Sequence, residues 1–88
     1  MNMKNQPDNS NNFATSDFYA AAFLTAKGYR LLGINKADSR RFRFIFTDEP
    51  YRAQLVSGYF AGLVEVNAKA FVTAIKELKS LMYNDAID

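Results

Sequence analysis

The sequence predicts an α+β fold, a single small domain in the order α-β-β-α-α, in which helices pack on one face of an antiparallel β-hairpin. Three observations lead to this prediction. Phenylalanine alternates with other residues along Arg41–Thr47, which is the period of a half-buried strand. Helix start and stop signals stand on both sides of this segment. The chain has 88 residues, enough for one hydrophobic core and no more.

The first helix is expected over Phe18–Lys27. Thr15 or Ser16 precedes it as the N-cap, and Asp17 falls in the first turn, where the helix dipole favours an anion. Gly28 is expected to end it, because glycine adopts the left-handed conformation that closes many helices. The preceding stretch is rich in asparagine, so residues 1–14 are expected to be a disordered tail, residues 15–84 the domain, and residues 85–88 a frayed end.

The hairpin occupies the middle of the chain, and its sides follow from alternation. In the second strand Phe42, Phe44 and Phe46 lie on one side, and Arg41, Arg43, Ile45 and Thr47 on the other. In the first strand Tyr29, Leu31 and Gly33 lie on one side, and Arg30, Leu32 and Ile34 on the other. The short polar connection makes the strands antiparallel neighbours. The phenylalanine row is expected at the centre of the core, and Gly33 is expected to mark a bulge or a close backbone contact.

Two helices complete the domain. Asp48, Glu49 and Pro50 form a start signal for a helix from Glu49 to Ala61, with Tyr51, Leu55, Tyr59 and also Val56 and Phe60 facing inward and Gly62 as its stop. Asn67 is expected to cap a last helix over Ala68–Tyr83, which carries one apolar stripe. Between them, residues 63–66 are interpreted as a connector, with a third strand along the hairpin edge as the alternative.

Composition excludes several classes of chemistry. The chain has no cysteine and no histidine, so disulfides, thiolate or imidazole metal sites, and imidazole bases are excluded. Its carboxylates show no metal-loop spacing. We therefore expect no catalytic residues, no cofactor and no metal, and thus a protein that is not an enzyme. No signal peptide and no apolar run of about 20 residues is seen, which indicates a cytoplasmic protein.

Positive charge is concentrated in the hairpin. The net charge of the chain is +2, yet residues 27–43 hold six basic residues against Asp38 alone. The six candidate contact residues are Lys27, Arg30, Lys36, Arg40, Arg41 and Arg43. Arginines on a pleated face pair with phosphate oxygens while aromatic rings stack on bases. The expected function is therefore a non-enzymatic module that binds nucleic acid through the outer face of the hairpin, with Arg30, Arg41 and Arg43 as principal contacts.

A protein partner is the alternative reading of the same face. Leu32, Ile34 and Ile45 would form an apolar centre inside the arginine rim, as protein interfaces often do. Exposed strand edges also accept a strand from a partner or from a second copy, so a homodimer belongs to this alternative. The chain would then act as an adaptor or inhibitor of a host machine, or as a self-associating subunit.

Several short segments resemble a known family. They are Asp17-Phe18-Tyr19, Ala22-Phe23-Leu24, Ala26-Lys27-Gly28-Tyr29, Leu31-Leu32, Arg40-Arg41 before Phe44-Ile45-Phe46-Thr47-Asp48, Tyr59-Phe60 with Gly62, and Phe71 with Ala74-Ile75 and Leu78. Together they resemble a small bacterial and phage domain family that has no assigned function, over about residues 15–83. The resemblance implies short cytoplasmic proteins, often of phage or mobile-element background, and it supplies no catalytic residues.

Overall fold

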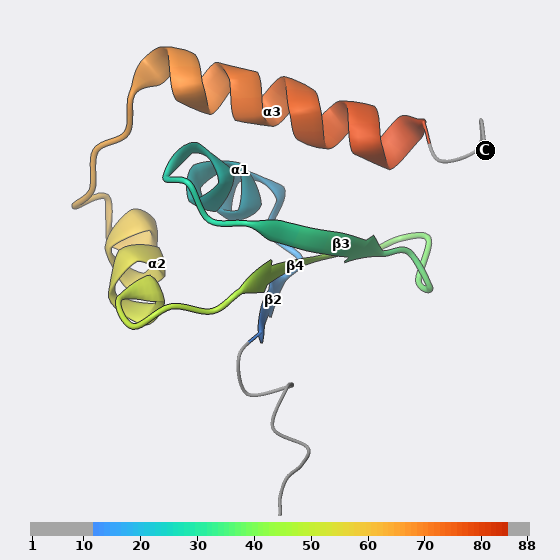
Figure 1. Ribbon diagram of the computed structural model, residues 1–88, viewed down its shortest axis with the longest axis horizontal. Helices are drawn as coiled ribbons and strands as arrows, with labels where there is room; N and C mark the ends of the chain where they lie inside the picture. Colours follow the sequence, from blue (N-terminus) through green and yellow to red (C-terminus); the bar gives the residue numbers. More distant parts are fainter. Residues whose placement is uncertain (1–11, 85–88) are drawn as a thin grey trace, which may run out of the picture.

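Residues 12–84 are described by a computed structural model, which is shown in Figure 1. The elements in chain order are β2 (Asn12–Thr15), α1 (Phe18–Ala26), β3 (Leu31–Asn35), β4 (Arg43–Thr47), α2 (Arg52–Ala61) and α3 (Ala68–Tyr83). Three antiparallel strands and three helices make up these residues, which confirms the predicted α+β class. The hairpin of β3 and β4 and all three expected helices are present.

The sheet has one strand more than the sequence predicted. Its order is β2-β4-β3, and β2 pairs with β4 through Phe13 opposite Phe46 and Thr15 opposite Phe44. The assignment of residues 12–14 to a disordered tail is therefore wrong. The strand forms because Phe13, which stands between the short side chains of Asn12 and Ala14, packs against the core beside Phe46. Residues 1–11 and 85–88, the rest of the expected tail and the expected frayed end, lie outside the described residues.

The centre of the core is α1, which lies between α3 and the sheet in Figure 1. The five consecutive residues Ala20–Leu24 are all buried, so the middle of this helix is enclosed on every side and the helix is not amphipathic. The three alanines have small side chains, and this lets the neighbouring helices and strands approach closely. Phe44 and Phe46 are buried beneath α1 as predicted, whereas Phe42 at the end of the row is half-buried.

The two ends of α1 are closed by side-chain and backbone hydrogen bonds. Asp17 is the N-cap in place of the expected Thr15 or Ser16, and its carboxylate accepts a hydrogen bond of 2.8 Å from the Ala20 N–H. At the other end Gly28 has a φ of 96°. The Tyr29 N–H donates to the Leu24 carbonyl and the Gly28 N–H to the Thr25 carbonyl. This is a Schellman motif, which confirms the predicted stop.

The start of α2 is three residues later than predicted. The helix begins at Arg52 because the carboxylate of Asp48 accepts hydrogen bonds from Glu49 N–H and from the Arg52 guanidinium instead of capping a helix at Glu49. Leu55, Val56 and Tyr59 pack against the core as predicted. Tyr51 and Phe60 do not, since 69% and 60% of their surface is exposed.

The last helix has the predicted bounds. Asn67 caps α3 by accepting a hydrogen bond from Ala70 N–H, and Ala74 and Leu78 are buried against α1. Residues 63–67 have no regular secondary structure, which confirms the connector and not the third strand.

Candidate functional site

Within residues 12–84, one face of the sheet carries no helix. The core contains the side chains that β2, β3 and β4 direct toward α1 and α3, whereas the residues on the opposite side do not belong to it. By strand register, this second side consists of Asn12, Ala14, Arg30, Gly33, Asn35, Arg43, Ile45 and Thr47. We call these residues the uncovered face. Antiparallel sheets commonly leave one side in water, so the arrangement follows from the fold itself.

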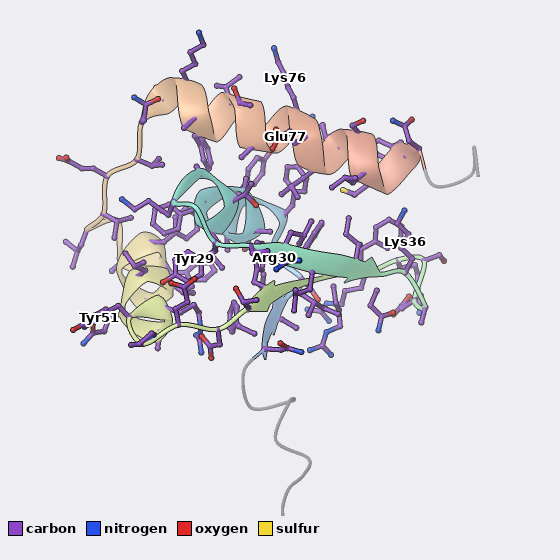
Figure 2. The ribbon with its side chains drawn as sticks, viewed as in Figure 1. Tyr29, Arg30, Lys36, Tyr51, Lys76 and Glu77 are labelled. Atoms are coloured by element: carbon purple, nitrogen blue, oxygen red, sulfur yellow. The ribbon has the colours of Figure 1, made fainter. Side chains whose placement is uncertain are left out.

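Two of the predicted principal contacts lie on the uncovered face. Arg43 is opposite Asn35, and the carbonyl of Arg30 accepts a hydrogen bond of 3.1 Å from Thr47 N–H at the other end of β4. Figure 2 shows Arg30 where the chain enters β3. Both arginines are exposed, and within residues 12–84 neither forms an ion pair. Ile45 is half-buried between them, which makes the centre of the face apolar.

A bulge in β3 changes the predicted alternation. The pairing with β4 shifts between Leu31 and Gly33, so that Leu31 opposes Phe46 but Ile34 opposes Phe44. Ile34 therefore lies on the helix-covered side and packs against the core, and its predicted place on the outer face is wrong. Gly33 moves to the uncovered face for the same reason. The bulge that was expected at Gly33 is confirmed.

Leu32, the extra residue of the bulge, lies at the edge of the sheet. It is 46% exposed and lines a recess of about 460 Å³ with Leu31, Gly33, Ile34, Lys36 and Leu81. The recess follows the free side of β3, which pairs only with β4 in the described part of the chain. Leu32 and Ile45 thus occupy different surfaces, and the predicted apolar trio with Ile34 does not form.

Arg40 and Arg41 lie in the hairpin loop and not in β4, which begins at Arg43. Both are exposed, and Arg40 approaches the Asp38 carboxylate at 4.0 Å. They line a recess together with residues of α1 and α3. The expectation that Arg41 points outward from the strand is therefore wrong, since the strand is shorter than its alternation suggested.

Lys27 and Lys36 hold parts of the fold together. The Lys27 ammonium donates a hydrogen bond of 3.2 Å to the carbonyl of Glu65 in the connector and lies above the Phe23 ring. Lys36 donates to the carbonyls of Leu81 and Met82 at 3.1 and 3.0 Å, at the C-terminal end of α3. Figure 2 shows Lys36 beneath that end. Both lysines support helices or loops, and neither belongs to the uncovered face.

One cluster, formed by Asp48, Arg52 and Phe13, was not predicted from the sequence. The guanidinium carbon of Arg52 lies 3.8 Å from the Phe13 ring centroid, and its Nε is 2.9 Å from an Asp48 carboxylate oxygen. The hydrogen bond from Arg52 lowers the pKa of Asp48 below its ordinary value. The spacing of Asp48 and Arg52 by four residues was the only signal in the sequence, and it could not reveal the aromatic partner.

Two tyrosines, the buried Tyr29 and the half-buried Tyr59, have raised phenol pKa values. Burial, and then the charges of Glu49 and Asp48, raise the pKa of the Tyr29 phenol. Burial, and then Asp17 and Tyr19, raise the pKa of Tyr59, whose ring stacks on Phe23 at 5.1 Å. These two tyrosines are core residues. Tyr19, Tyr51 and Tyr83 are mostly exposed.

Residues 12–84 contain no group of three carboxylates placed to hold a metal ion. None of the helices in this range combines the length and the apolarity needed to cross a membrane. The family model of a domain of unknown function, DUF5659, matches residues 10–84 of the chain. No curated protein and no solved structure matches the chain.

Proposed function

The chain belongs to the DUF5659 family, whose function is unknown, and we propose that it is a non-enzymatic module that binds nucleic acid through the uncovered face of its sheet. The observation that carries the proposal is the pair Arg30 and Arg43, which share this face and have no acidic partner in residues 12–84. The proposal includes a cytoplasmic location and the phage or mobile-element background that the sequence resemblance implies.

The spacing of the two arginines suits a phosphate backbone. Arg30 lies beside Thr47, which is four residues from Arg43 along β4, so the two arginine positions are about 13 Å apart along the strand direction at about 3.3 Å per residue. A nucleic-acid strand carries one phosphate about every 3.4 Å of helix axis, so one strand offers phosphates at a separation that suits both arginines. Arg40 and Arg41 extend the positive charge beyond Arg43 into the hairpin loop.

The test compares two double variants with the same charge change. Arg30→Glu with Arg43→Glu should abolish binding to a labelled oligonucleotide, because it reverses the charge of the uncovered face. Lys69→Glu with Lys76→Glu should bind nearly as the wild type, since both lysines are exposed on α3, and Figure 2 shows Lys76 directed away from the sheet. Fluorescence anisotropy measures both. Equal losses of binding affinity in the two variants would show that only the net charge of the chain matters, and this would contradict the proposal.

A salt titration of the wild type gives an independent measure. If Arg30, Arg40, Arg41 and Arg43 each neutralise one phosphate, log K against log salt should have a slope of about −3.6 on duplex DNA and about −2.8 on single strands. A slope near zero would exclude phosphate contacts.

A protein contact is the second candidate function, and the free edge of β3 favours it. An extended partner segment can add to an unpaired strand edge while its side chains enter a neighbouring recess, and here exposed Leu32 borders such a recess. Leu32→Asp should then abolish partner capture with little salt dependence, and the Arg30→Glu and Arg43→Glu changes should not. If the partner is a second copy, sizing chromatography should show a dimer that Leu32→Asp dissociates.

A further inference from the structure

The end of the molecule beyond the hairpin contains a recess built from three elements that are distant in the sequence. It has a volume of about 480 Å³. Its lining residues are Ser16, Phe18, Ser39, Arg40, Arg41, Phe42, Phe44, Met82 and Tyr83. They come from the start of α1, the hairpin loop with the start of β4, and the last turn of α3. We call this the hairpin-end recess, and its volume lies within the range of about 300–1,000 Å³ typical of small-molecule sites.

Aromatic rings form one side of the hairpin-end recess. Phe18 stands edge-on to Phe44 with centroids 6.0 Å apart, and it also contacts the Tyr19 ring at 5.2 Å. A smaller recess of about 250 Å³ shares Phe18, Met82 and Tyr83 with it and adds Tyr19 and Lys79. Tyr83 is 70% exposed. Exposed rings of this kind present the flat faces on which bases stack.

The charge of the two recesses is positive. Arg40, Arg41 and Lys79 line them, and no described acidic residue does. Asp38 lies near Arg40 at 4.0 Å, but Arg40 is almost fully exposed and this contact is loose. Arg41 has no ion pair within residues 12–84. An anionic ligand with a planar aromatic part therefore matches both the charge and the rings.

We propose that the hairpin-end recess takes an unpaired nucleotide, with its base stacked on Tyr83 and its phosphate held by Arg40 and Arg41. This inference rests on the proposed function and makes it specific, because bases inside a duplex are stacked on one another and cannot enter a recess. The domain then prefers single strands or strand ends. The uncovered face binds the backbone, and the recess selects for an unstacked base.

The test uses two tyrosines with nearly the same exposure. Tyr83 and Tyr51 are 70% and 69% exposed, but Tyr51 lies at the start of α2, at the other side of the molecule in Figure 2. Tyr83→Ala should weaken binding to a labelled oligothymidine by about 5- to 150-fold, the range expected for the loss of one stacked base. Tyr51→Ala should leave it unchanged, and neither change should alter binding to a duplex of equal length.

The arginines of the recess provide a second readout. Arg40→Ala with Arg41→Ala should reduce the salt slope on single strands by about 1.4, which is two phosphate contacts at about 0.7 each. An unchanged slope would show that Arg40 and Arg41 do not contact a phosphate.

The outcomes separate this inference from the proposed function. If Tyr83→Ala binds single strands as the wild type does, or if duplex and single strand bind equally, the recess inference is overturned, while the Arg30→Glu and Arg43→Glu result still decides the function. If the wild type binds no oligonucleotide, the proposed function falls. Adenosine monophosphate then tests the recess alone by NMR: shifts at the Tyr83 ring that ribose 5-phosphate does not produce support the recess, and their absence overturns it.

Discussion

The guanidinium group of Arg52 packs on the ring of Phe13 and so links α2 to β2. The guanidinium carbon of Arg52 is 3.8 Å from the centroid of the Phe13 ring, and the same group donates two hydrogen bonds to Asp48 at 2.9 and 3.3 Å. Arg52 belongs to α2, Phe13 to β2, and Asp48 follows β4 directly. β2, a strand of four residues, is thus held by its pairing with β4 and by the contact of its Phe13 ring with Arg52 of α2.

A double-mutant cycle on this contact should give a measurable coupling. We expect Phe13→Leu and Arg52→Gln each to lower the free energy of unfolding, and the pair to lose less than the sum by about 0.5–1 kcal/mol, the usual strength of a cation–π contact near the surface. Urea unfolding measures all four proteins. Strict additivity would show that the ring and the guanidinium do not interact, and β2 would then depend on the sheet alone.

The pair of Asp48 and Arg52 also predicts how stability depends on pH. The hydrogen bond from Arg52 is the largest cause of the lowered pKa of Asp48, whose ordinary value is 3.8. A carboxyl with a lower pKa in the folded state contributes stability above its unfolded pKa and loses it as the pH falls through the folded value. We therefore expect Asp48→Asn to reduce the melting temperature at pH 7 and to reduce it less at an acidic pH below the ordinary value of 3.8. The effect should be small, because a quarter of the side chain is exposed and water screens the pair. An equal loss of melting temperature at both pH values would show that the loss comes from packing and not from charge.

Most of the fold could be predicted from local signals in the sequence. The stop of α1 at Gly28, the start of α3 after Asn67 and the burial of the phenylalanine row were predictable. Each of these features depends on residues that are close in sequence. β2 was missed since a strand of four residues carries almost no periodic signal and depends on partners 29 to 35 residues away. The start of α2 was placed too early because Asp48 binds Arg52 instead of capping the helix.

The candidate site could be predicted only in part, for a geometric reason. Alternation correctly placed Arg30, Arg43 and Ile45 on one face, but it fails beyond a bulge, where one extra residue moves every following side chain to the other face. Ile34 was therefore assigned to the wrong side. Arg40 and Arg41 were grouped with Arg43 by sequence distance, although the loop carries them into a recess with Phe18 and Tyr83. The recess joins residues of α1, the hairpin loop and α3, which are distant in the sequence, so no local sequence pattern could predict it.

Two glycines should respond differently to the same substitution. Gly62 ends α2 with a φ of 75°, and the Leu63 N–H donates to the Gly58 carbonyl across it. Gly62→Ala should cost about 1 kcal/mol of unfolding free energy, because an alanine is strained in the left-handed region. Gly33→Ala should cost nothing or stabilise slightly, since Gly33 lies in a strand and no atom of the described residues is within 4 Å of an added methyl group. Thermal unfolding compares the two variants. A larger loss at Gly33 would show that something approaches the uncovered face there.

We expect Lys36 to contribute to the stability of the fold. Its ammonium donates to two carbonyls at the last turn of α3 and lies 5.6 Å from the Phe42 ring centroid, so it ties the hairpin to the negative end of the helix dipole. Lys36→Met keeps the aliphatic stem and removes the charge, and we expect it to lower the free energy of unfolding by about 1–2 kcal/mol, because hydrogen bonds to a charged group are the stronger ones. Lys76→Met, on the exposed side of α3, should change it by less than about 0.5 kcal/mol. If the two variants are equally stable and Lys36→Met instead loses oligonucleotide binding, Lys36 belongs to the binding surface, as its position in the sequence first indicated.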